Sequence, residues 1–246
     1  MSQGALPAAG RFGALRSRLT PNRAAFAGVF VVTMLTLLAV GAVLPVLPRY
    51  VKGPLGSGDL AVGIVIGSYA VFGLLCRPLA GGLADARGRR PIVIGGSLLC
   101  AVAGLLYFVP AGVPGLIVAR MFLGIGEGAV YTAGAAWIVD LAPVERRGRI
   151  IGLYGLAIWG GLSVGPAIGE ILLRVSSFET VWAFAVATPL LAAVIALRIP
   201  DRRTGTGEAS SGTASPGPAP PNRSARGRRR FRRSARRCRR RRRRTP

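Results

Sequence analysis

Two charged residues, Arg120 and Glu127, stand seven residues apart inside residues 111–139, a stretch with no other charge. Seven residues of α-helix span about 10 Å and return to nearly the same face. A charge within a membrane span is costly and normally faces the bundle interior or a water-filled cavity. Because desolvation disfavours a charged carboxylate, Glu127 is a candidate proton carrier or contact for a cationic substrate. The alternatives are an arginine satisfied by backbone carbonyl groups and a glutamate neutralised by a polar neighbour.

The elements that would position these residues are long apolar segments. A helix needs about 20 apolar residues to cross a bilayer. Segments of about that length, each with at most two charges, occupy residues 24–48, 60–76, 91–109, 111–139, 150–173 and 180–197. The pattern predicts an all-α membrane protein with six transmembrane helices. Pro45 and Pro48 are expected to mark the outer end of the first helix.

Metal and cofactor chemistry is disfavoured by the composition. The chain has no histidine, and its three cysteines show no CxxC spacing. Cys76 and Cys100 fall in membrane segments and are expected to be packing residues. We therefore expect no cofactor, no metal site and no enzymatic activity.

The distribution of basic residues predicts the orientation in the membrane. Short cytoplasmic loops are enriched in arginine and lysine. With the N-terminus inside, the inner segments up to residue 203 hold 13 arginines, against three basic residues outside, Arg49, Lys52 and Arg174. The sequence thus predicts a multi-pass protein of the plasma membrane with both termini in the cytoplasm.

The composition also suggests where the membrane part begins and ends. Residues 1–23 read as a cytoplasmic segment, 24–199 as the membrane domain and 200–246 as a disordered tail. A linker rich in Gly, Ser, Thr, Ala and Pro covers residues 204–221, and 15 arginines follow between Arg223 and Arg244. Such a segment buries too little apolar surface to fold.

A first motif lies between the second and third segments, where residues 81–90 read GGLADARGRR. The spacing G-x-x-x-D-x-x-G-R-R resembles the signature loop of the major facilitator superfamily, although Ala86 stands where that family usually has a basic residue. The resemblance implies a cytoplasmic gating loop in which Arg89 pairs with two carboxylates. The implied gating residues are Gly81, Asp85, Gly88, Arg89, Arg90 and Asp140. Arg77 is expected to join this cluster or to reach lipid headgroups.

Two further motifs follow in the order that this family shows. R-x-x-x-G-x-x-x-G begins at Arg120 and resembles the helix-four motif whose arginine is associated with proton coupling. Residues 161–170, GLSVGPAIGE, resemble the antiporter signature of helix five, with Glu170 in place of its final glycine. The implied residues of that helix are Gly161, Gly165, Pro166 and Gly169.

The resemblance implies the N-terminal half of the superfamily fold, built as two inverted three-helix repeats, and proton-coupled efflux of a drug, sugar or metabolite. Its partners would be protons, a small-molecule substrate, the bilayer and a C-terminal half. We expect a truncated, inactive half, whose tail is read out of frame. The alternative is a half-transporter that works as a homodimer, with a tail that binds anionic lipid rather than a specific nucleic acid.

This view also predicts what the isolated half must cover. The Gly161, Gly165 and Gly169 stripe would pack against the second half. Without that half, the stripe and the face bearing Arg120 and Glu127 are expected to meet lipid or another copy. The substrate itself is not indicated by the sequence.

Overall fold

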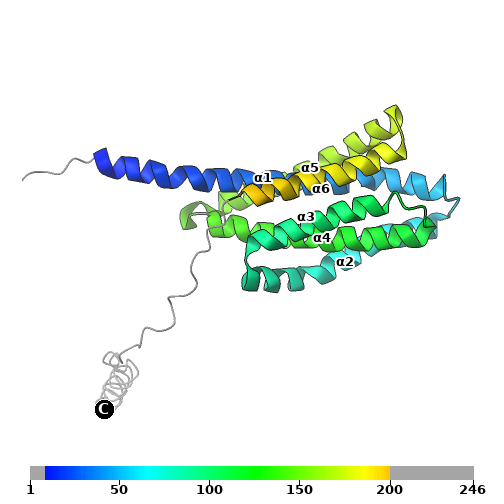
Figure 1. Cartoon of the computed structure of the whole chain (residues 1–246), viewed down its shortest axis with the longest axis horizontal. Helices are drawn as coiled ribbons and strands as arrows, with labels where there is room; N and C mark the ends of the chain where they lie inside the picture. The colour runs from blue at the N-terminus through cyan, green and yellow to red at the C-terminus, as the bar shows by residue number, and fades with distance from the viewer. Residues whose placement is uncertain (1–8, 200–246) are drawn as a thin grey trace, which may run out of the picture. The chain divides into compact units, whose positions relative to one another are not determined.

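The computed structural model describes residues 9–199, so the expectations for residues 1–8 and for the tail at 200–246 lie outside the described residues. These residues form six α-helices joined by short connections, and no strand occurs among them. The helices are α1 (Ala9–Lys52), α2 (Asp59–Arg87), α3 (Arg89–Leu106), α4 (Gly112–Leu141), α5 (Arg147–Val175) and α6 (Phe178–Arg198), with a 3-10 turn at Val144–Arg146. Figure 1 shows them lying side by side. The predicted all-α fold is confirmed.

Each of these helices contains a segment long and apolar enough to cross a membrane; in α1 it is Ala24–Lys52, and in the others the whole helix. The lengths run from 18 residues in α3 to 30 in α4, which fits a hydrocarbon layer of about 30 Å. The chain is a multi-pass membrane protein.

Two helix boundaries differ from the sequence prediction. Pro45 and Pro48 do not end the first helix, because α1 continues to Lys52. Neighbouring helices can satisfy the backbone groups that a proline frees within a span. The motif loop is also mostly helical, since α2 runs through Asp85 to Arg87. The turn is made at Gly88, whose φ of 97° is a conformation that favours glycine.

The packing follows a two-fold pattern that relates α1–α3 to α4–α6. The most extensive packing is that of α1 on α5 and of α2 on α4, which are equivalent pairs under this relation. Likewise α3 packs on α4 and α6 on α1, while α3 and α6 pack on each other. This arrangement agrees with the two inverted three-helix repeats that the family resemblance implies.

Two buried hydroxyl groups in the bundle donate hydrogen bonds to their own helices. Thr36 donates to Val32 O at 2.9 Å, and Ser97 donates to Val93 O at 2.9 Å. Such bonds to the preceding turn remove the cost of burying a hydroxyl. Among the described residues, the buried charged side chains are Arg120 and Glu127.

Candidate functional site

Arg120 and Glu127 lie inside the bundle on α4. Arg120 is 0% exposed and Glu127 is 5% exposed. The Nε, Nη1 and Nη2 atoms of Arg120 have no hydrogen-bond partner among the described residues. Its guanidinium carbon instead lies 5.5 Å from the ring centre of Tyr69, a residue of α2. An arginine over an aromatic face gains roughly 2 kcal/mol when both groups are shielded from water.

Glycines on α4 bring the neighbouring helices close enough to cover these charges. A Cβ added at Gly128 would lie 2.8 Å from the carbonyl oxygen of Gly73 on α2. A Cβ added at Gly126 would lie 2.6 Å from the carbonyl oxygen of Gly96 on α3. Both approaches are shorter than a real side-chain carbon tolerates. The charged face of α4 is thus closed by α2 and α3 of the same chain. The expectation that this face meets lipid or another copy was wrong.

Arg77 lies along the same contact between α2 and α4. Its guanidinium carbon is 4.6 Å from the ring centre of Tyr131, and its charge faces Glu127. The predicted positions were the cytoplasmic cluster or the lipid headgroups. In the structure Arg77 does not join the Asp85–Arg89–Asp140 cluster but forms a cation–π pair with Tyr131, because α2 carries it to the level of Tyr131 on α4. A contact with lipid headgroups stays a prediction.

Asp85, Arg89 and Asp140 form a charge cluster at the end of the bundle where α2 is followed by α3. Arg89 donates from Nε to Oδ2 of Asp140 at 3.1 Å, and from Nη1 to Oδ1 of Asp85. Asp85 and Gly81 lie on α2, whereas Asp140 lies on the last turn of α4. Arg89 therefore joins α2, which carries Arg77, to α4, which carries Arg120 and Glu127.

Arg90 makes a second connection from the same loop. Its Nε atom donates to the carbonyl oxygen of Ala196 at 3.2 Å, and its Nη2 atom donates to that of Leu197. Both carbonyl groups belong to the last turn of α6, where helix carbonyls lack intrahelical partners. The favourable position of a cation at a helix C-terminus adds to this contact. Arg90 thus caps α6.

The glycine stripe of α5 is buried against α1. A Cβ added at Gly161 would lie 2.8 Å from the carbonyl oxygen of Met34, and one at Gly165 would lie 2.7 Å from that of Leu38. One at Gly169 would overlap the carbonyl oxygen of Ala42. The prediction that this stripe packs against a second half was therefore wrong.

Pro166 lies in the same contact, since a Cβ added at Gly41 of α1 would be 3.1 Å from its Cδ atom. The glycines and the proline of the helix-five motif together set the distance between α1 and α5. Glycine stripes allow such close approach of membrane helices.

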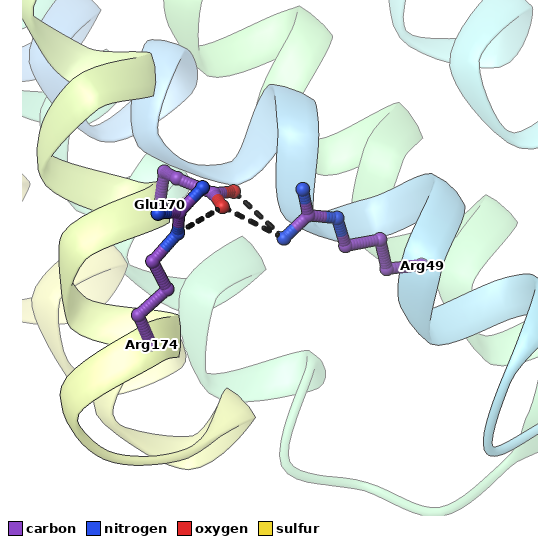
Figure 2. A network of polar contacts seen from close by, with 3 residues as sticks. All are labelled: Arg49, Glu170 and Arg174. Carbon is purple, nitrogen blue, oxygen red and sulfur yellow. Dashed lines mark hydrogen bonds and ion pairs between the residues drawn. The ribbon is translucent and has the colours of Figure 1, made fainter.

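An ion-pair cluster near the C-terminal ends of α1 and α5 has no counterpart in the sequence prediction. Figure 2 shows Glu170 between Arg49 and Arg174. Arg49 Nη1 lies 2.8 Å from Oε2 of Glu170, and Arg174 Nε lies 2.7 Å from Oε1. The cluster therefore joins α1 to α5 near the C-terminal ends of both helices. Only the i, i+4 spacing of Glu170 and Arg174 was visible in the sequence.

The cysteines of the membrane segments pack against α4. Cys76 Sγ lies 3.4 Å from the carbonyl oxygen of Ile125, and Cys100 Sγ lies 3.9 Å from that of Leu123. Across residues 9–199, no group of three or more His, Cys, Asp or Glu side chains is placed to hold a metal ion. Cys238 lies outside the described residues.

Comparisons with known proteins agree with this arrangement. The profile of the Major Facilitator Superfamily matches residues 29–242. An uncharacterised MFS-type transporter of Salmonella typhimurium is 36% identical over 174 residues, covering 68% of this chain and 45% of that protein. Multidrug resistance protein 1 of Bacillus subtilis is 32% identical over 171 residues, covering 68% and 43%. The crystal structure of the human organic anion transporter MFSD10 (TETRAN) matches with a TM-score of 0.61 at 22% identity, covering 73% of this chain and 47% of that one.

Proposed function

Because the chain belongs to the major facilitator superfamily, whose members are transporters rather than enzymes, we propose that it forms the N-terminal half of a proton-coupled exporter of small molecules. The observation that carries the proposal is the burial of Arg120 and Glu127 on one helix, at the contact of α2, α3 and α4. Buried ionisable groups within membrane spans mark ion and substrate pathways.

In this proposal Glu127 binds either a proton or a cationic group of the substrate. A carboxylate shielded from water is most stable when a single positive charge neutralises it. The proton and the cationic group of the substrate therefore compete for Glu127. Competition for a single site is what couples proton entry to substrate exit. The similarity to a multidrug resistance protein supports lipophilic cations as the first substrates to test.

We propose that the Asp85–Arg89–Asp140 cluster is the cytoplasmic gate. Arg89 is partly exposed, and its two carboxylate partners are more exposed still. Exposed ion pairs are weak, roughly 0–1 kcal/mol each. A gate must open in each cycle, and such weak contacts hold a closed state without trapping it. Gly81, Gly88 and Arg90 would shape and anchor this gate.

Transport would further require a second bundle. The chain spans about half the length of the curated relatives that it matches. Transporters of this fold bind substrate between two halves near the bilayer midplane. Exposed apolar side chains follow α2 and α5, among them Leu74, Leu79, Leu156 and Trp159. A C-terminal half is the partner that we propose for these helices, and a second copy of the chain is the alternative.

We also propose that the protein lies in the plasma membrane and that both of its termini are in the cytoplasm. Residues 1–23 and 200–246 would then flank a membrane domain at 24–199. Accessibility labelling in intact cells tests this orientation in a chain whose native cysteines are replaced. A cysteine at Ser57, between α1 and α2, should react with an impermeant reagent, and one at Gly148, near the start of α5, should not.

The transport proposal is tested by reconstituting the chain in liposomes with an imposed proton gradient, alone and with a six-helix C-terminal half. We expect gradient-driven flux of lipophilic cations only with that half, and its loss in Glu127→Gln. Glu179→Gln is the matched control, because Glu179 is an exposed glutamate in the first turn of α6. Flux by the chain alone, abolished by Glu127→Gln, would establish the homodimer instead. Flux that survives Glu127→Gln would refute the role of this carboxylate.

A further inference from the structure

The backbone of Tyr69 lies against α4 between its two charges. A Cβ added at Gly124 would overlap the carbonyl oxygen of Tyr69, so the two helices touch at this level. Gly124 follows Arg120 by four residues and precedes Glu127 by three. Residues at these spacings share one face of a helix. Tyr69 therefore lies opposite the part of α4 between Arg120 and Glu127, whose backbone positions are about 10 Å apart along the helix axis.

Each part of the Tyr69 side chain meets one of the two charges. Its ring centre lies 5.5 Å from the guanidinium carbon of Arg120. Its hydroxyl group faces the Glu127 carboxyl group. An aromatic face attracts a cation, whereas a phenolic hydroxyl donates to a carboxylate. One residue of α2 thus serves both buried charges of α4.

The surroundings leave Arg120 with few other polar contacts. Within the described part of the chain, its three side-chain nitrogens have no hydrogen-bond partner, and neither has the buried hydroxyl group of Tyr107, the residue that follows α3. Tyr107 and Tyr69 flank the guanidinium from different parts of the chain. Only Tyr69 also reaches Glu127, so Tyr107 provides a matched control.

We propose that Tyr69 is a positioning residue that links the charge state of Glu127 to Arg120. With Glu127 charged, the hydroxyl group donates to the carboxylate and the ring is held on the guanidinium. When Glu127 binds a proton or a cation, this hydrogen bond weakens and the ring is released from its fixed position. Arg120 then becomes free to move. Tyr69 keeps its own proton throughout. The release of Arg120 rests on the proposed function, whereas the link of Tyr69 to the two charges does not.

Other groups also face Glu127. They are Cys76 and Arg77 on α2, Cys100 on α3, and Tyr154 on α5. Of these, Arg77 carries a charge that favours the carboxylate. The test must therefore separate the hydroxyl group of Tyr69 from this background.

Infrared difference spectra of the purified 246-residue chain provide that separation. The spectrum of the wild type minus that of Glu127→Gln isolates the carboxyl band of Glu127 in either protonation state. In a Tyr69→Phe background, which keeps the ring and removes one oxygen atom, we expect this band to move because a hydrogen bond is lost. In a Tyr107→Phe background we expect it to stay. No movement in Tyr69→Phe, or equal movement in both, would overturn the proposal.

Two further measurements test the link, the first of them even if the Tyr69→Phe variant does not fold. In the wild-type chain with carbon-13 in tyrosine and glutamate, solid-state NMR should show a contact between a tyrosine ζ-carbon and a glutamate δ-carbon that disappears in Glu127→Gln. Its absence from the wild type would refute the link even if Tyr69→Phe does not fold. The stability effects of Tyr69→Phe and Glu127→Gln should be non-additive, and those of Tyr107→Phe and Glu127→Gln additive. None of these readouts requires transport, so the link can hold even where the exporter proposal fails.

Discussion

The contact of α2 with α4 and the contact of α1 with α5 are equivalent under the two-fold pattern, yet only the first buries charged side chains. In both, glycines let one backbone touch the next: Gly73 meets Gly124 and Gly128, and Gly41 meets Gly165. The α2–α4 contact covers two charges of α4, Arg120 and Glu127. In the described residues, the α1–α5 contact is uncharged along its length and bears ion pairs near the C-terminal ends of the two helices.

This difference separates two roles that share one scaffold. Close glycine packing fixes the distance between helices, and it does so equally well in both contacts. Enclosed charges cost stability, since burial removes them from water. Placing them in one contact only keeps that cost local, while the equivalent contact holds the bundle together. If the α1–α5 contact is structural and the α2–α4 contact is functional, substitutions in the two contacts should have different effects on stability and transport.

The α1–α5 contact should not tolerate a side chain at its narrowest point. Gly169→Leu places a side chain on the carbonyl oxygen of Ala42, and backbone cannot move aside as a flexible side chain can. Overpacking costs about 1–3 kcal/mol, occasionally more, so we expect loss of the folded, monodisperse chain in detergent. The measurement is size-exclusion chromatography with thermal unfolding.

The matched control is Gly160→Leu on the same helix, where an added Cβ meets no described heavy atom within 4 Å. It should be tolerated. Gly124→Leu in the α2–α4 contact should be as damaging as Gly169→Leu. If only one of these two variants unfolds, the contacts are not equivalent scaffolds.

Removing the buried arginine should have opposite effects on stability and transport. Arg120→Met replaces an arginine that lacks hydrogen-bond partners among the described residues by an apolar chain of similar length. Replacement of buried ionic groups by apolar ones is often neutral or stabilising by about 1–4 kcal/mol. We expect higher resistance to denaturation and no gradient-driven flux with the C-terminal half present.

Ile117→Met, an apolar exchange one turn earlier on α4, should change neither property. A destabilised Arg120→Met would mean that the charge supports the fold. The α2–α4 contact would then be structural, like its counterpart, and the contrast between the two would disappear.

Opening the Asp85–Arg89–Asp140 cluster should have a smaller effect. Asp85→Asn weakens one of the two contacts of Arg89. An exposed pair is worth about 0.2–1 kcal/mol, so the balance between closed and open states should shift by up to about fivefold toward inward-open. Cysteine labelling from the cytoplasmic side of the assembled transporter measures this shift.

Asp59→Asn is the control, because Asp59 pairs with Lys52 at the opposite end of the bundle. It should leave cytoplasmic labelling unchanged. Equal labelling in both variants and the wild type would remove the gate from the proposed mechanism.

The sequence was sufficient to predict the helices and the buried charges of α4, but not the residues that contact these charges. Apolar length predicted every span, since crossing a bilayer demands it. It could not predict that α2 extends to Arg87, because glycine, alanine and charged residues near a helix end fit a loop equally well. Nor could it show which face of α4 is covered. That depends on glycines from three helices meeting at one level, and Tyr69, an ordinary aromatic residue of a span, gave no local signal of its contact with Arg120.

The smallest effect is expected at the ion pairs that Glu170 makes in the α1–α5 contact. Glu170→Gly restores the glycine of the family motif and frees Arg49 and Arg174. All three side chains reach water, where ion pairs are screened and contribute little. We therefore expect an unfolding temperature close to that of the wild type at high salt and a slight decrease at low salt. Arg198→Gly, a change at an exposed arginine outside the cluster, controls for lost charge. A large loss of stability in Glu170→Gly alone would show that α1 and α5 depend on charge as well as on glycine packing, and would reduce the contrast with α2–α4.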